Sequence, residues 1–179
     1  MPYSDQTFDP KVKDFLAQNH AKKYLDIGPG AGKYGKMIRD VNSNAYIVAI
    51  EAEKSYISKF NLRDLYDEVH HTKIEDFINS QPSFTVDITI VGDCLEHLKK
   101  SDGVDLIHYL VYRTKFVVLV FPSKYIQYDW NGHINESHNS VWGKEDFRLF
   151  NFDYQKQGFM NLVIIKGYVG DPEAECPKS

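Results

Sequence analysis

The chain has 179 residues, about one domain's worth, and 42% of them are hydrophobic while 26% are charged. This balance is typical of a globular protein and excludes collagen-like, coiled-coil and disordered classes. The net charge of −4 provides no global basic field to attract nucleic acid, and no stretch approaches the ~20 consecutive apolar residues that span a bilayer.

Two cysteines, Cys94 and Cys176, are too few for a disulfide scaffold, and residues 1–9 lack the basic and apolar regions of a signal peptide. We therefore expect a cytoplasmic protein with no membrane segment.

Strand-like and helix-like patterns alternate along the first two thirds of the chain, which predicts parallel βαβ units. Helical patterns cover residues 8–19, 33–40, 53–65, 74–79 and 101–113, the last with Ser101 as its N-cap. Strand patterns cover residues 23–27, 45–50, 68–72, 84–91 and 116–121.

The last third has a different character. A long polar and aromatic stretch, 123–142, precedes a short helical segment at 144–150 and two strands, 151–157 and 160–169, joined near Gly158. These strands predict a terminal hairpin. We expect residues 1–169 to form a single domain and residues 170–179 to be a flexible tail.

A glycine-rich loop, Asp26-Ile27-Gly28-Pro29-Gly30-Ala31-Gly32, follows the first predicted strand. Glycines allow positive φ and let a ligand approach the backbone, and this turn lies where ligands bind in open α/β sheets. Two cofactor classes fit, and a tight turn without a ligand is a third reading. Gly30 to Gly35 matches the dinucleotide pattern G-x-G-x-x-G, whereas Asp26 to Gly32 matches D-x-G-x-G-x-G, a pattern for S-adenosylmethionine (SAM). A carboxylate at Asp26 has no role beside a dinucleotide but can meet the ammonium of SAM, so SAM is favoured.

A second carboxylate, Glu51, ends the next predicted strand. At that place it can accept hydrogen bonds from both ribose hydroxyls of a nucleoside. NAD and SAM share this requirement, so Glu51 supports a nucleoside cofactor without separating the two.

The run Gly92-Asp93-Cys94-Leu95-Glu96-His97-Leu98 follows the fourth predicted strand. Together with the glycine loop and Glu51, it resembles the class I SAM-dependent methyltransferases, and its D-x-L-E-H form resembles the branch that methylates small molecules and sugars. The resemblance implies an α/β fold, a Rossmann-like doubly wound sheet of seven strands in the order 3-2-1-4-5-7-6, with the last strand antiparallel.

The resemblance also implies a set of cofactor-binding residues. Asp26, Gly28 and Gly30 would hold the methionine part, Glu51 the ribose, and Ala52 and Ile74 the adenine. Lys73 stands where the family often has an acidic residue for the adenine amine, so that contact falls to Glu75, Asp76 or a backbone carbonyl. The remaining cofactor-binding residues are Pro29 and Tyr34 near the loop and Asp93, Cys94 and Leu95 on the sulfonium side.

Few sequence motifs identify the methyl acceptor. In-line methyl transfer mainly requires that the enzyme position the two reactants, and a base is needed only for a poor nucleophile such as a hydroxyl. The chain lacks the Asn/Asp-Pro-Pro-aromatic run of amino-methylating DNA enzymes and the Pro-Cys of cytosine C5 enzymes. Many family members have an H-x-x-x-W pattern, which His138 to Trp142 matches. We hypothesise that His138 is the general base or orients the acceptor; the alternative is that it holds its loop by backbone hydrogen bonds.

No metal site is expected, because neither His133, Glu136 and His138 nor His70-His71 has a zinc-type spacing. We expect methyl transfer from SAM to a small polar acceptor, at oxygen rather than nitrogen. Methylation of nucleic acid or protein and a catalytically inactive SAM-binding module remain alternatives. A nucleic-acid acceptor is not favoured unless six lysines form a basic stripe on one face of the protein. These lysines are Lys11, Lys13, Lys22, Lys23, Lys33 and Lys36. The oligomeric state stays open.

Overall fold

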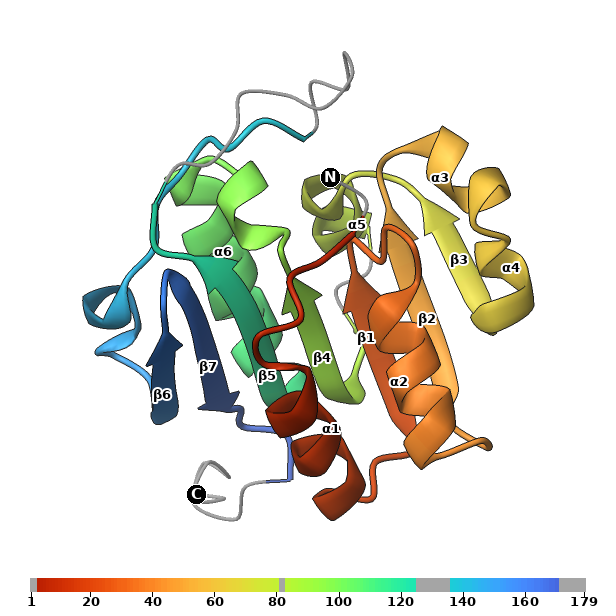
Figure 1. The fold of residues 1–179 in the computed structure, drawn as a ribbon, viewed down its shortest axis with the longest axis horizontal. Helices are drawn as coiled ribbons and strands as arrows, with labels where there is room; N and C mark the ends of the chain where they lie inside the picture. Colours follow the sequence, from red (N-terminus) through yellow and green to blue (C-terminus); the bar gives the residue numbers. More distant parts are fainter. Residues whose placement is uncertain (1–2, 81–82, 125–135, 171–179) are drawn as a thin grey trace, which may run out of the picture.

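A seven-stranded sheet forms the centre of the molecule (Figure 1). The structure is a computed structural model that describes residues 3–80, 83–124 and 136–170. The strand order is β3-β2-β1-β4-β5-β7-β6, which confirms the predicted order. The strands are β1 (Lys23–Ile27), β2 (Tyr46–Glu51), β3 (Glu68–His71), β4 (Val86–Gly92), β5 (Thr114–Pro122), β6 (Phe152–Gln157) and β7 (Met160–Lys166).

The first five strands pair in parallel, and β7 pairs antiparallel with both β5 and β6. The parallel strands therefore end at the same edge of the sheet, drawn uppermost in Figure 1. Any side chain that follows β1, β2 or β4 is delivered to that edge, where ligands bind in such sheets.

Helices cover both faces of the sheet (Figure 1). One hydrophobic cluster holds apolar side chains of α1 and α2, and the other holds those of α5 and α6. Because both faces are covered, the central strands are apolar almost throughout. The helices are α1 (Asp9–Gln18), α2 (Lys33–Val41), α3 (Lys54–Lys59), α4 (Leu62–Leu65), α5 (Ile74–Ser80) and α6 (Lys100–Val111), with 3₁₀ turns η1 (Leu95–His97) and η3 (Lys144–Phe147).

Three local predictions were wrong. The helix predicted over 53–65 is broken into α3 and α4, because Asn61 adopts a left-handed conformation with φ of 50°. The helix predicted from Ser101 begins at Lys100 with Lys99 as N-cap, and the Ser101 hydroxyl donates to the Asp102 carboxylate instead. The helix predicted over 144–150 is only the 3₁₀ turn η3. Of the predicted tail, residues 171–179 lie outside the described part of the chain.

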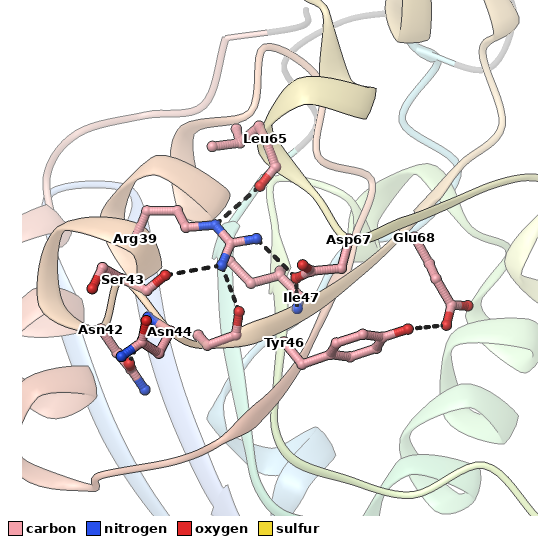
Figure 2. Close-up of polar contacts among 10 residues, drawn as sticks. Arg39, Asn42, Ser43, Asn44, Tyr46, Ile47, Leu65, Asp67 and Glu68 are labelled. Carbon is pink, nitrogen blue, oxygen red and sulfur yellow. Dashed lines mark hydrogen bonds and ion pairs between the residues drawn. The ribbon is translucent and has the colours of Figure 1, made fainter.

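The opposite edge of the sheet is held together by Arg39 at the end of α2 (Figure 2). Its guanidinium donates to the carbonyls of Leu65, at 3.2 Å, and Ala45, and to the carboxylate of Asp67 at 2.8 Å. The same Asp67 oxygen accepts the Ile47 N–H at 2.7 Å. One cation thus joins α2 to the beginnings of β2 and β3, away from the edge where the strands end.

Candidate active site

A cavity of about 370 Å³ opens at the carboxyl edge of β1, β2 and β4. The residues that line it come from the loop after β1, the end of β2, the start of α5 and the turn after β4, and also from α3, α6 and the segment after β5. Eight of the twelve predicted cofactor residues lie on its wall: Gly28, Gly30, Glu51, Ala52, Ile74, Glu75, Asp93 and Cys94. The structure thus brings together residues that the sequence only placed at strand ends.

Close packing of the glycine loop explains part of its sequence. Gly28 has φ of 68°, and a Cβ atom there would lie 2.8 Å from the Cys94 Sγ. The Gly30 N–H donates to the Glu51 Oε2 at 3.2 Å. The loop therefore rests against the turn after β4 on one side and the end of β2 on the other.

Asp26 lies behind the loop and not on the cavity wall. It is fully buried, and its Oδ2 accepts a hydrogen bond of 2.6 Å from the Tyr66 hydroxyl. Its Oδ1 has no partner among the described residues. Burial raises the pKa of this carboxyl to about 6, against the lowering effect of the Tyr66 hydrogen bond.

Gly35, the last glycine of the G-x-G-x-x-G match, makes room for the buried hydrogen bond between Tyr66 and Asp26. A Cβ at Gly35 would lie 2.4 Å from the Cζ of Tyr66. The glycine therefore lets the Tyr66 ring pass close to α2, as its hydroxyl bonds to Asp26. The pattern that suggested a dinucleotide has a packing role here.

Glu51 faces the cavity with its carboxylate already positioned. It is 5% exposed, its Oε1 accepts the Glu53 N–H at 2.7 Å and its Oε2 accepts the Gly30 N–H. Burial raises its pKa to about 7, despite these two hydrogen bonds. Each oxygen keeps a further lone pair, so the group can still accept hydrogen bonds from vicinal hydroxyls.

The cavity is acidic. Six carboxyl side chains line it and only two lysines, Lys73 and Lys99; the acids are Glu51, Glu53, Glu75, Asp93, Asp102 and Glu136. Burial also raises the pKa of Asp93 to about 6, while Lys33 acts in the opposite direction. An excess of buried and half-buried acids favours a cationic ligand and disfavours a pyrophosphate.

The other three predicted cofactor residues support the wall from behind. Pro29 is part of the loop but does not line the cavity, and Tyr34 and Leu95 are buried. A Cβ at Gly92 would lie 2.0 Å from the Tyr34 ring, so that ring packs directly under the end of β4.

Sequence reasoning missed several lining residues. His97 and Leu98 belong to the same run as Asp93, and extending the site to the end of that run would have included them. Tyr56, Thr72 and Asn139 also line the cavity and carry no motif that would have identified them.

A second cavity of about 200 Å³ shares Asp93 and His97 with the first. Its other walls come from the N-terminal segment, from Glu96 in η1, from His138 and from Met160 at the start of β7. A group in this cavity would therefore lie beside a ligand in the larger one.

His138 lies on the wall of this second cavity. Its ring is 4.9 Å from that of His97, edge to face, and its Nδ1 is buried without a partner among the described residues. Burial and the neighbouring His97 lower the pKa of His138 to about 4. The ring is therefore neutral near pH 7 and can accept a hydrogen bond or bind a cation.

Other residues hold the loop around His138. The backbone N–H groups of Asn139 and Ser140 donate to the Glu96 carbonyl at 2.8 and 3.1 Å. Trp142 is 1% exposed, and its Nε1 donates to the Ser140 hydroxyl at 2.7 Å. The two backbone hydrogen bonds thus attach the segment to η1, and the Trp142 hydrogen bond links two residues of the segment itself. Five further polar and aromatic residues of the 123–142 stretch lie outside the described residues: Tyr125, Tyr128, Asp129, Trp130 and His133.

No protein-family model matches the sequence, and no curated protein matches it. The fold is similar to that of many solved structures. An O-methyltransferase family protein from Burkholderia thailandensis aligns with a TM-score of 0.65 and 11% identity, over 92% of this chain and 57% of that one. The N-terminal domain of EvdMO1 with SAH bound aligns with a TM-score of 0.65 and 9% identity, over 92% and 83% of the two chains. The methyltransferase domain of bacterial CtHen1 gives a TM-score of 0.66 and 16% identity, over 90% and 98%.

This chain therefore spans little more than half of the Burkholderia protein and nearly all of the CtHen1 domain. Within the described residues, no helix combines the length and apolar character needed to cross a membrane. At such low identities the likeness concerns the fold: the chain has the Rossmann-like, seven-stranded fold of the SAM-dependent methyltransferases.

Proposed function

We propose that this protein is a SAM-dependent methyltransferase that transfers the methyl group to an oxygen of a small polar acceptor. The observation that carries the proposal is the acidic cavity at the carboxyl edge, where the glycine loop is hydrogen-bonded to Glu51. SAM carries a sulfonium and an ammonium and no phosphate, so its charge complements this cavity.

Each part of the cofactor has a complementary wall. Glu51 accepts the ribose hydroxyls, and Ala52, Ile74 and Glu75 surround the adenine. Gly28, Gly30 and Cys94 line the methionine part, with Asp93 on the sulfonium side. Asp26 adds negative charge from behind the loop, and Pro29, Tyr34 and Leu95 keep the wall in place. The SAH-bound EvdMO1 domain, which shares the fold, supports this choice of cofactor.

The size and position of the second cavity support the proposal of a small acceptor. Its volume of about 200 Å³ is below the ~300–1,000 Å³ of pockets for drug-sized ligands. Because Asp93 and His97 belong to both cavities, an acceptor here lies beside the transferable methyl. His138 contributes on the acceptor side, where its neutral ring can orient a hydroxyl.

The charge distribution gives little support to a nucleic-acid acceptor. Two lysines of the stripe that such an acceptor would require are paired with acids. Lys33 lies 2.7 Å from the Asp9 carboxylate, and Lys13 lies 3.1 Å from that of Asp40. These pairs reduce the local positive charge available to phosphates.

Calorimetric titration of the full chain with SAH, SAM and NAD tests the cofactor. We expect SAH and SAM to bind and NAD not to bind. Glu51→Gln should weaken SAH binding by about 10- to 100-fold, since a hydrogen bond to a charged group contributes ~1.5–3 kcal/mol. Glu145→Gln, at an exposed position on η3, is the matched control and should bind SAH normally. Binding of NAD alone would refute the assignment.

Turnover is tested by incubating the protein with SAM and a pool of small metabolites and measuring SAH formation. Product in the small-molecule fraction supports the proposal. Methyl label in added RNA or protein instead would contradict the small acceptor, and tight SAH binding without turnover on any pool would favour an inactive binding module.

A further inference from the structure

Three side chains with metal-binding atoms meet at the junction of the two cavities. Glu96, His97 and His138 each place one ligand atom within 4.8 Å of the others. The first two belong to η1, and the third comes from the segment that follows β5. A single ion could therefore contact all three groups with small side-chain adjustments.

Two of these groups have unsatisfied polar atoms. Glu96 is 2% exposed, and its Oε2 has no hydrogen-bond partner among the described residues. The Nδ1 of His138 is buried and also has no partner there. A buried carboxylate without compensation is costly, and a cation bound by this cluster would supply that compensation.

The third group is oriented as metal-binding histidines usually are. The Nδ1 of His97 lies 3.1 Å from the Ser137 carbonyl oxygen. A carbonyl can only accept, so Nδ1 carries the proton and Nε2 keeps its lone pair. A hydrogen bond from the second ring nitrogen to a carbonyl is the common means of fixing a ligating imidazole.

The backbone also holds the cluster together before any ion binds. The Glu96 carbonyl accepts two N–H groups from residues 139 and 140, and the Asn139 side chain donates to the His97 carbonyl at 2.8 Å. His138 is thereby held beside η1. The preorganised contacts lower the ordering cost of binding an ion.

We propose that Glu96, His97 and His138 bind a divalent first-row transition-metal ion, such as Mn²⁺, Co²⁺ or Zn²⁺. Two imidazoles and one carboxylate suit these ions better than Ca²⁺ or Mg²⁺, which prefer oxygen ligands. Three protein ligands also leave coordination positions open for a small molecule, as in catalytic metal sites.

The role of the ion rests on the proposed methyltransferase function. The ion would face the second cavity beside Asp93, where the acceptor hydroxyl can bind to it. Coordination lowers the pKa of the hydroxyl, whose proton passes to solvent. The oxygen then bonds to the methyl carbon, and the carbon–sulfur electron pair returns to sulfur to give neutral SAH.

Equilibrium dialysis of the chelator-treated full chain against Mn²⁺, Co²⁺ or Zn²⁺, without SAM, tests the site. We expect one ion per chain for at least one of these metals. Glu96→Gln and His138→Asn should each weaken binding at least about tenfold, the lower limit for altering even an outer-shell partner. His70→Asn is the matched control, because His70 forms an exposed pair with Glu68 at 3.0 Å, and it should bind like the wild type.

A measurement on the wild type does not depend on the folding of variants. In imidazole-selective NMR spectra, Zn²⁺ should shift the signals of two of the seven histidines. Absence of stoichiometric binding for all three ions overturns the site, as does an equal loss of binding in His70→Asn or an unshifted histidine spectrum. A chain that binds SAH but no metal refutes only this inference, whereas a chain that binds metal but not SAH refutes the proposed cofactor and leaves the metal site standing.

Discussion

The buried carboxyl of Asp26 should make the stability of the unliganded protein depend on pH. Its pKa rises from 3.8 in the unfolded chain to about 6 in the folded one, so between these values the folded state holds a proton that the unfolded state has lost. Stability is therefore greatest below pH 4 for this group and falls as the pH rises through 6. A difference of about two pKa units, at 1.36 kcal/mol per unit, gives about 3 kcal/mol.

Asp26→Asn removes this titration, and the amide oxygen can still accept the Tyr66 hydrogen bond. We expect the difference in unfolding free energy, Asp26→Asn minus wild type, to increase by about 3 kcal/mol between pH 4 and pH 7. Urea unfolding at half-unit pH steps measures the difference. Asp40→Asn, at an exposed surface site, controls for the loss of one negative charge. Curves for wild type and Asp26→Asn that stay parallel over this range would show that Asp26 does not hold a raised pKa.

Two further predictions concern packing around the site. Tyr66→Phe removes the donor to the buried Asp26 carboxylate and should cost about 1–3 kcal/mol of unfolding free energy at pH 7. Tyr46→Phe, which loses an exposed hydrogen bond to Glu68 (Figure 2), should cost less, and equal losses in urea unfolding would contradict the reasoning. Gly103→Ala places a Cβ 2.4 Å from the Trp142 ring and should destabilise by about 1–3 kcal/mol, with altered tryptophan fluorescence. An alanine at Gly143, where a Cβ meets nothing within 4 Å, should change neither property, and an unaltered Gly103→Ala protein would exclude tight packing there.

The carboxyl edge of the sheet could be predicted from local patterns. Each apolar run marks a buried strand, and parallel strands end at one edge, so Gly28, Glu51 and Asp93 had to lie near one another. Their place on one cavity wall follows from that rule together with the strand order.

Contacts between distant segments could not be predicted in this way. Nothing near Asp26 indicates that Tyr66 would bond to it, and the left-handed Asn61 that breaks the predicted helix has no strong signal in its neighbours. His138 was identified from a motif, but its approach to Glu96 depends on how the segment after β5 folds back onto η1.

The sequence by itself therefore determined the order of strands and helices along the chain and the chemical character of the edge where the parallel strands end. Hydrophobic periodicity and the positions of glycines set these features, because both determine the local structure of a few residues. Only the tertiary structure decided that Asp26 lies behind the cavity wall, that a second cavity adjoins the first and that Glu96, His97 and His138 converge. These features arise from side-chain packing between segments far apart in the chain, and no local pattern encodes which of those segments meet.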